Sequence, residues 1–461
     1  MPIAKGAKSV IKWAAESTWG TAPATGFKAV TFISETLSES INPIMSDELR
    51  QDRSVPNARG GNIKAGGEVV MDLGPSRHGR WLEHLLGSTV VDAAQTPAEL
   101  IAATYVVGDV RKSSGGVFVC VQGGVVANGT ATAVTADNVT DTCVYGSAHG
   151  LTTGQAVVLA ASSLPSGLTA GTFYVRVVDT LTVGLYPTRA DALANTNKTL
   201  WTTNGTSVTL AAAANLTAAN GVYTSGAARF VYVGADSLSL FKHTMTAGAD
   251  YPTGGISIEK GIRGGDSEMW LVFEGCRMNT LSVDVPQEGI VKTTWGVLAK
   301  DVIQSASAKA SPGSDITDYA CVGYETVVCV GTDTTSRPIK ECKIDITNNV
   351  QEDVFTVNSR YREELPEARR EIKGNIGVYF KDAVDYNRFK NETAFAMSIA
   401  FYRASGGVVI FEFPEVKIFG SPTPQVSGNN VIMSSFDFNV FRNTAAYDCR
   451  VTIVDTNATL L

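Results

Sequence analysis

The sequence is poor in the residues that carry most enzyme chemistry. It has four histidines among 461 residues, and none stands in an H-E-x-x-H or H-x-x-E-H pattern. It also lacks a Walker A pattern, a G-x-S-x-G elbow and a G-x-G-x-x-G run after a predicted strand. Asp284 and Glu288 are paired carboxylates at a predicted turn, with no apolar pocket predicted around them. We therefore expect no catalytic site and no cofactor, and we expect His78 and His84 at the surface.

Long hydrophobic runs and paired cysteines are also missing. The first residues, MPIAKGAKSV, contain lysines but no apolar core of signal-peptide length, and no later run is long enough to cross a bilayer. The seven cysteines are odd in number, scattered, and never spaced as C-x-x-C. The sequence therefore predicts no signal peptide, no membrane helix and no metal site. We expect the cysteines to be buried, reduced thiols.

Positive charge is in short supply as well. The formal net charge is -7 at pH 7, whereas a protein that grips nucleic acid needs a strong positive field. This balance argues against tight binding of DNA and still allows transient contact with it. Only 18% of the residues are charged, and Gly, Thr and Val are frequent, so a soluble, β-rich protein is predicted.

Two stretches of alternating strand pattern resemble each other. They run from Glu268 to Asp301 and from Gly407 to Asn443, each with an apolar strand core, a turn marked by Pro and Gly, and a returning strand. Trp295 matches Phe436 about 141 residues later, and a constant offset over about thirty positions indicates a duplication. We expect the aromatic residues of both copies to form an inter-unit sheet: Trp270, Phe273, Trp295, Phe411, Phe436 and Phe438.

Each copy also contains a long charged stretch, at residues 42–66 and 348–373. Both stretches are too polar and too rich in turn residues to be core strands, so each is a loop or arm. One alternative is a solvated loop. The presence of a second arm at the corresponding place favours a contact surface, where charge pairs set register and partner choice. The charged residues expected to make these contacts are Asp47, Glu48, Arg50, Asp52, Arg53, Arg59, Arg360, Arg362, Glu363, Glu364, Arg369 and Arg370.

The predicted fold is mainly β, with two tandem β-sandwich or barrel units, each carrying one short helix, and an inserted small all-β domain. The length allows roughly three domains. The first unit is discontinuous, residues 1–94 and 220–304, and it is followed by a linker, 305–317, and a second unit, 318–461. Residues 95–219 have no counterpart in the second copy and form the insertion.

Five aromatic residues of the insertion admit two interpretations. On a small β domain they can stack against sugar rings, or they can form the core of a thin sheet. We favour the core and keep a sugar-binding or host-binding surface protein as the alternative function. The five residues are Tyr105, Phe118, Tyr174, Tyr186 and Trp201.

Several short sequence motifs lie outside the insertion: E-S-T-W-G-T at 16–21, D-E-L-R at 47–50, D-R at 52–53, G-G-E-V-V-M-D-L at 66–73, F-E-G-C at 273–276 and V-D-V-P-Q-E-G-I-V at 283–291. With these motifs the sequence resembles the major tail tube proteins of long-tailed, siphophage-like bacteriophages. The resemblance covers residues 1–94 and 220–455, whereas the insertion departs from the plain family pattern and is similar to accessory β domains of phage structural proteins.

This resemblance implies a structural virion protein of the phage tail, assembled in the host cytoplasm. Such a protein polymerises into stacked rings around a lumen, and DNA passes through the lumen without specific binding. Its expected partners are other copies of itself, the tail terminator, the tape measure and the distal tail proteins, with no membrane partner.

The duplication adds an expectation about the ring. Rings of the resembled family are six-fold with one unit per chain, so a chain with two units predicts a C3 trimer with pseudo-six-fold symmetry. We expect the insertion to project outwards, three times per ring, and to be dispensable for assembly. We expect the two arms to stack the rings and the lumen to be lined by acidic and neutral side chains, because a basic bore would retain DNA.

Overall fold

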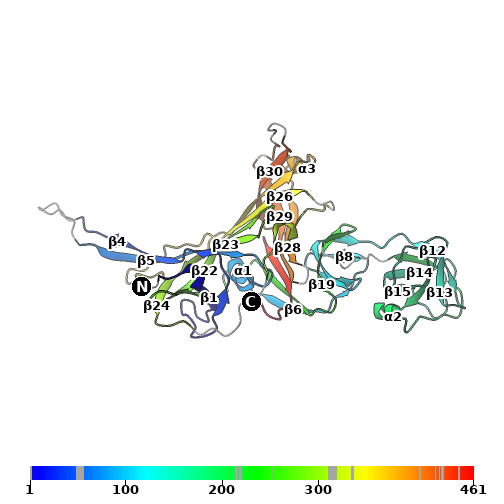
Figure 1. Ribbon diagram of the computed structural model, residues 1–461. Coiled ribbons are helices and arrows are strands. Elements are labelled where there is room, and N and C mark those ends of the chain that lie inside the picture. The colour runs from blue at the N-terminus through cyan, green and yellow to red at the C-terminus, as the bar shows by residue number, and fades with distance from the viewer. Residues whose placement is uncertain are drawn as a thin grey trace.

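The computed structural model describes residues 3–47, 57–212, 216, 221–252, 254–309, 319–333, 337–403, 406–420, 422–424, 426, 430–444 and 447–460. Strands dominate it, which confirms the mainly β fold class (Figure 1). Two strand-rich units lie at the centre, a long hairpin arm extends from one of them, and a small barrel lies at the opposite end. Two short 3-10 helices, η1 (Gly6–Lys8) and η2 (Gly323–Glu325), accompany the strands.

The first unit is built on one long strand, β22 (Met269–Val285), which takes part in two sheets. Its residues up to Cys276 belong to one sheet, here called the outer sheet. Its residues from Arg277 onward belong to another sheet, here called the inner sheet. The left-handed conformation of Gly275, with φ of 61°, lies between the two halves and favours glycine there. The outer sheet has the order β2 (Lys28–Val30), β1 (Val10–Ala15), β21 (Ile256–Ile262), β22, β24 (Asp301–Ser305).

The second unit repeats this plan on β29 (Gly407–Phe419), so the structure carries the same duplication as the sequence. The first half of β29 lies in the outer sheet of this unit and its second half pairs within the inner sheet. Two strands from the first part of the chain extend this outer sheet. Its order is β25 (Thr326–Val330), β28 (Phe395–Arg403), β29, β31 (Arg450–Asp455), β20 (Leu240–Thr246), β6 (Val91–Gln95).

One antiparallel inner sheet runs through both units. The two units meet where β22 pairs with β26, from Thr280 opposite Thr347 to Val285 opposite Cys342, and we call this pairing the seam. The order of the inner sheet is β3 (Ser34–Glu35) and β4 (Ser38–Ile44), β5 (Arg59–Asp72), β23 (Lys292–Ala299), β22, β26 (Ile339–Thr347), β27 (Glu371–Tyr379), β30 (Met433–Phe441), β29.

The aromatic residues predicted to join the units are all buried. Three of them, Trp295, Phe436 and Phe438, lie on inner-sheet strands β23 and β30. The others lie on the first halves of β22 and β29, which belong to the outer sheets: Trp270, Phe273 and Phe411. The seam itself is formed by the second half of β22 and by β26. Five of the six side chains belong to the core beside it, and Trp270 instead lies beneath the cationic groups of Lys12 and Arg263.

A short helix packs on the buried face of the inner sheet in the first unit, as predicted. Helix α1 (Gly79–Leu86) places Trp81 edge-on against Trp295, with ring centroids 5.5 Å apart. It ends at Gly87, whose left-handed conformation closes the helix. The equivalent helix α3 (Val384–Lys390) lies at the corresponding place in the second unit and is more exposed.

The expectation that His78 and His84 lie at the surface is wrong, because α1 is enclosed on nearly all sides. The His78 ring stacks on Trp295 at 5.6 Å, and its Nε2 lies 3.0 Å from the carbonyl oxygen of Asp72. Burial lowers the pKa of His78 to about 4 and that of His84 to about 3, so both are neutral core residues. The seven cysteines are buried, as expected.

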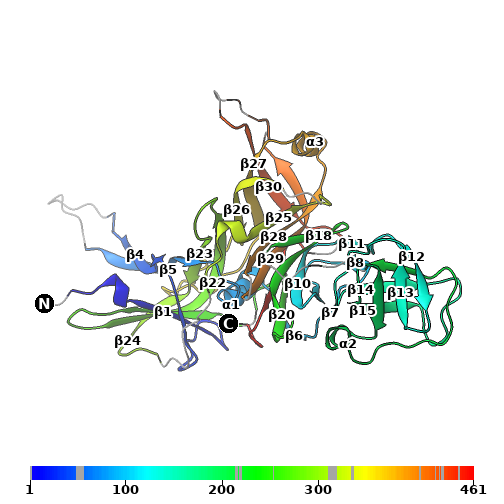
Figure 2. The same cartoon turned by 45° about the vertical axis from the view of Figure 1, so that its right-hand side comes forward.

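The insertion has two parts, which Figure 2 shows one beyond the other. The nearer part, here called the insertion sheet, includes two strands that follow residue 219. Its order is β18 (Val222–Ser225), β19 (Ala228–Ala235), β10 (Gly116–Gln122), β9 (Val110–Ser113), β7 (Ala98–Glu99), with the hairpin β8 (Ala103–Tyr105) and β11 (Gly124–Val126) beside it.

The farther part is a closed barrel with a hydrophobic core of its own. A six-residue helix, α2 (Arg189–Ala194), lies beside it. The order around the barrel is β12 (Thr132–Asp137), β13 (Thr142–Tyr145), β16 (Thr182–Tyr186), β15 (Gly171–Val177), β14 (Ala156–Ala160), β17 (Thr209–Ala212).

Candidate assembly surfaces

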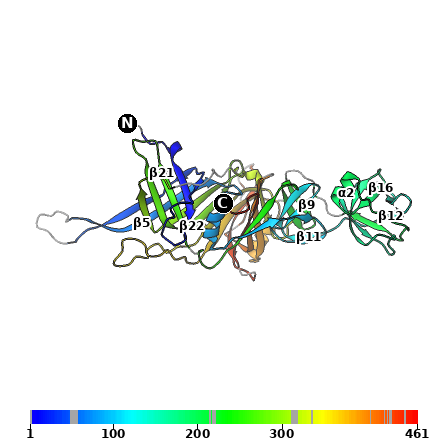
Figure 3. The ribbon, with the colours of Figure 1, turned by 90° about the horizontal axis from the view of Figure 1, so that it is seen from below.

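The first arm is the hairpin of β4 and β5, which extends well beyond the body of the first unit (Figure 3). Every residue of β4 is exposed. Among the charged residues predicted for this arm, Asp47 and Arg59 are described and exposed. The arm also exposes Ile44 and Met45, which sequence reasoning did not single out. The predicted contact residues Glu48, Arg50, Asp52 and Arg53 lie outside the described residues.

The second arm, residues 348–370, folds back onto the base of the first arm. Arg362 is 1% exposed and donates to the carbonyl oxygens of Ala65 at 2.6 Å and Ala299 at 2.7 Å. Arg360 donates to Gly61 O at 3.0 Å. Both arginines therefore hold the second arm against strands of the first unit, and Arg362 is not available to a neighbouring chain.

Arg370 has a similar internal role. Its guanidinium donates to the carbonyl oxygens of Leu86 at 3.1 Å and Gly248 at 2.9 Å, and it pairs with Asp448 at 3.1 Å. Buried Asn348 adds a bond to Leu85 O at 2.8 Å, and the sequence pattern did not mark it as a contact residue. The remaining predicted charges of this arm are exposed and face outward: Glu363, Glu364 and Arg369.

The face of the inner sheet opposite α1 carries polar side chains, and we call it the polar face. Along one row, neighbouring strands place charges of opposite sign side by side. The row runs Asp72, Lys292, Asp284, Lys343, Asn375, Asp437 across six strands and crosses the seam.

Further ion pairs lie on the same face. Lys343 pairs with Asp345 at 3.1 Å and Lys373 pairs with Glu371 at 2.6 Å. These lysines are therefore matched by carboxylates, so the polar face has no large excess of positive charge.

The inner sheet ends in two open edges. In the part of the chain that the structure describes, no strand pairs with the outer edge of β4, or with residues 417–419 at the end of β29 on the side away from β30. Exposed sheet edges are templates for pairing with another chain. The duplication relates each open edge to one strand of the seam. β4, together with β3, is the counterpart of β26, and β29 is the counterpart of β22.

A family model described as phage tail tube protein matches residues 6–440 of the chain. This chain belongs to the phage tail tube protein family. The match spans both units, the arms and the insertion, and confirms the resemblance found in the sequence. It identifies a structural component of a phage tail. No curated protein sequence matches the chain.

The burial of the five aromatic residues of the insertion bears on the alternative of sugar binding. Tyr105, Phe118, Tyr186 and Trp201 are at most 3% exposed, and Tyr174 is half-buried. Stacking on sugars requires exposed rings, which the four buried residues do not offer. Trp201 belongs to the barrel core, and Tyr105 and Phe118 belong to the core beside the hairpin β8–β11. Among the described residues, no helix is long and apolar enough to span a membrane.

Proposed function

We propose that three copies of this chain close into a ring, and that the rings stack into the phage tail tube through which DNA reaches the host. In this proposal the inner sheets of three chains form a continuous wall around the lumen. The role is structural, without catalysis. Assembly takes place in the host cytoplasm, and the finished tube meets the tail terminator, the tape measure and the distal tail proteins.

The seam is the observation that carries this proposal. Inside one chain, β22 of the first unit pairs with β26 of the second over six residue pairs. The equivalent strands lie at the two ends of the same sheet, where β3–β4 and the last three residues of β29 are open. Pairing β29 of one chain with β4 of the next repeats the seam between chains, and a closed ring then has no free edge.

The arms are proposed to connect successive rings. The first arm reaches beyond its own unit and exposes Asp47, Arg59, Ile44 and Met45, which combine charge with apolar surface. In the second arm, we limit the stacking role to the exposed residues Glu363, Glu364 and Arg369. Exposed charge pairs are screened over about 8 to 10 Å at physiological ionic strength, so high salt should weaken stacking.

The polar face is proposed to line the lumen. Duplex DNA carries one negative charge per roughly 1.7 Å, and free lysines along the wall would bind it at many points. Lysines that lie between carboxylates offer no such net attraction. DNA is therefore a transient passenger and is not bound specifically.

A proline in the open edge tests ring closure. Thr36 donates its backbone N–H to Glu68 on β5, so strand alternation directs the N–H of Glu39 away from β5. Proline is tolerated on an edge strand but cannot donate to an added strand. We expect Glu39→Pro to remain a folded chain that no longer forms rings by electron microscopy, whereas Glu39→Ala forms them. Normal tubes from Glu39→Pro would contradict the proposed edge pairing.

A further inference from the structure

A cavity of about 330 Å³ lies where three parts of the chain meet. Val222 and Arg229 of the insertion sheet line one side, and residues 285–287, at the end of β22 in the first unit, line another. The second unit completes the walls, chiefly with residues of β25 and β26. Val285 and Cys342 form the last residue pair of the seam and both line the cavity, so it lies at one end of the seam.

Arg229 is a buried charge in the wall of this cavity. It is 4% exposed, and strand alternation places it on the same side of β19 as Val231 and Val233, which pack against the second unit. Among the described residues it has no ion-pair partner and no hydrogen-bond partner for Nε, and its Nη1 lies 3.7 Å from the Cys329 thiol. Burial of a guanidinium without a counter-charge is costly, so we expect a ligand or partner to supply negative charge here.

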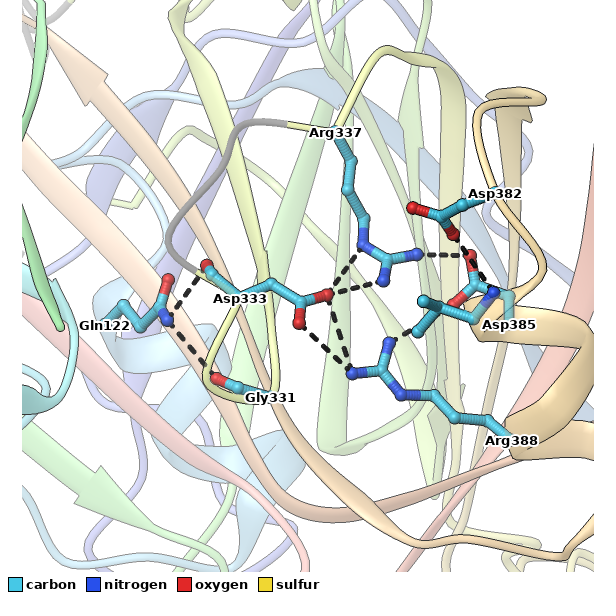
Figure 4. Close-up of polar contacts among 8 residues, drawn as sticks. Gln122, Gly331, Asp333, Arg337, Asp382, Asp385 and Arg388 are labelled. Carbon is cyan, nitrogen blue, oxygen red and sulfur yellow. Dashed lines mark hydrogen bonds and ion pairs between the residues drawn. The ribbon is translucent and has the colours of Figure 1, made fainter.

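A second arginine in the same wall has its charge matched, as Figure 4 shows. Arg337 lines the cavity as well, and its guanidinium pairs with two carboxylates, that of Asp333 at 3.1 Å from Nε and that of Asp385. Arg388 converges on the same two carboxylates, at 3.5 Å from Asp333 and 3.2 Å from Asp385. Two negative charges are therefore matched by two positive charges within this cluster, and none remains to neutralise Arg229.

Two further donors line the cavity. The hydroxyl oxygen of Thr326 on β25 is buried and has no hydrogen-bond partner among the described residues. Lys340 on β26 adds an ammonium group, which lies 3.6 Å from the sulfur of Met433. The one acidic residue among those lining the cavity, Glu341, is exposed, and its side chain lies over Gly377 of the neighbouring strand β27. A guanidinium, an ammonium and a hydroxyl group all donate to the oxygen atoms of an anion.

We propose that this cavity is a binding site for an oxyanion, a carboxylate or a phosphate group, which Arg229 binds together with Thr326 and Lys340. Free phosphate is one source of such a group. The exposed carboxylates on the arms of another copy of the chain are a second source, and this source rests on the stacking of rings proposed above. The ligand chemistry is the same in both cases, and the two sources differ in whether the site works in a single chain or only in the tube.

The topology of the inner sheet favours the arms as a source. β26 begins beside the cavity at Ile339 and ends at Thr347, directly before the second arm. β4 ends at Ile44, directly before the first arm, and its partner β5 ends at Asp72, in the same row as Asp284 beside the cavity. Both arms therefore leave the sheet at the end opposite the cavity. In a head-to-tail stack, the arm end of one ring faces the cavity end of the next. The exposed carboxylates of the arms are those of Asp47, Glu363 and Glu364.

Thermal melts of the dilute, unassembled full-length chain test the site independently of assembly. We expect inorganic phosphate to raise the melting temperature of the wild-type chain more than chloride does at equal ionic strength. Arg229→Met should bind phosphate about tenfold more weakly. Arg369→Met removes the same charge from an exposed position and should respond to phosphate like the wild type. If Arg229→Met does not fold, Thr326→Val removes a second donor of the site and should also weaken the effect of phosphate.

Tube lengths measured by electron microscopy distinguish the two sources. If an arm of the next ring supplies the carboxylate, tubes of Arg229→Met and of Glu363→Gln/Glu364→Gln/Asp47→Asn should be shorter than wild-type tubes, and phosphate should shorten wild-type tubes more than chloride does. If free phosphate is the ligand, it stabilises the dilute chain and Arg229→Met leaves tube length unchanged. No effect of phosphate on the dilute wild-type chain, together with Arg229→Met tubes of normal length, would overturn the site. A wild-type chain that forms no tubes would overturn the ring proposal, while the melts would still decide the anion site.

Discussion

At the scale of single residues, His243 shows how distant parts of the chain are tied together. It is fully buried on β20, with Nδ1 2.6 Å from Asp92 on β6 and Nε2 3.2 Å from Asp455 on β31. The carbonyl oxygen of Asn457 accepts from the same Nε2, and the hydroxyl of Ser76 donates to Asp455. Burial alone would lower the pKa of His243, but the bonds and charges of Asp455 and Asp92 outweigh it and raise the pKa above 6.5.

This cluster predicts a pH dependence of stability. A raised pKa in the folded state means that the contribution of His243 is complete below about pH 6.5 and is lost as the pH rises through the folded-state pKa. The wild-type chain should therefore lose more thermal stability between about pH 6 and pH 9 than His243→Gln, which cannot become charged. Melting curves of both proteins across this range test the prediction. Parallel pH profiles would count against a charged His243.

Arg362 gives a second prediction at this scale. Its replacement by alanine leaves the carbonyls of Ala65 and Ala299 without their donor inside the protein. We expect Arg362→Ala to lower the free energy of unfolding by roughly 2–4 kcal/mol. Arg369→Ala, seven residues later and exposed, should change it by less than about 0.5 kcal/mol. Chemical denaturation of both variants distinguishes them, and equal midpoints would refute the anchoring role.

At the scale of elements, the barrel is separable from the rest of the insertion. Its two ends lie close together, because Thr132 pairs with Leu210 and Gly129 N bonds to Ala212 O at 2.7 Å. Deletion of residues 130–212 with a short Gly-Ser bridge should leave folded chains that form rings with smaller protrusions. Electron microscopy and native mass measurement check this outcome. Loss of rings from such a folded deletion variant would show that the barrel takes part in assembly.

Several elements could be predicted from the sequence because their signal is local. The alternation in β22 and β29 and the constant offset of Trp295 and Phe436 identified the long strands and the duplication. The pairing partners of β6 and β20 could not be predicted, because alternation shows that a segment is a strand and not which strand it joins. The burial of Arg362 was missed for a similar reason, since its partners are backbone carbonyls of distant strands that no side-chain pattern marks.

At the scale of the whole molecule, the distribution of charge is consistent with the proposed passage of DNA. On the polar face, the rows of matched charges keep the lysines next to carboxylates, and the chain as a whole has a formal charge of -7. Removing the carboxylates of one row should expose the lysines. We expect tubes of the triple variant Asp72→Asn/Asp284→Asn/Asp437→Asn to retain duplex DNA in a salt-dependent way.

The matched control neutralises three acidic residues of the barrel and its helix α2, the exposed Asp179 and the partly exposed Asp137 and Asp191. It changes the net charge by the same amount without altering the polar face. Co-sedimentation of tubes with labelled duplex DNA compares the two triple variants. Equal retention of DNA by both would contradict the assignment of the polar face to the lumen.

The number of chains in a ring tests the central claim most directly. A reconstruction of the tube by electron cryo-microscopy, supported by the native mass of a single ring, would give this number. We predict three chains per ring, an inner wall in which the β22–β26 seam alternates with its β29–β4 equivalent, and three outer protrusions. Six chains per ring, six protrusions, or a wall that leaves β4 and β29 unpaired would contradict the account.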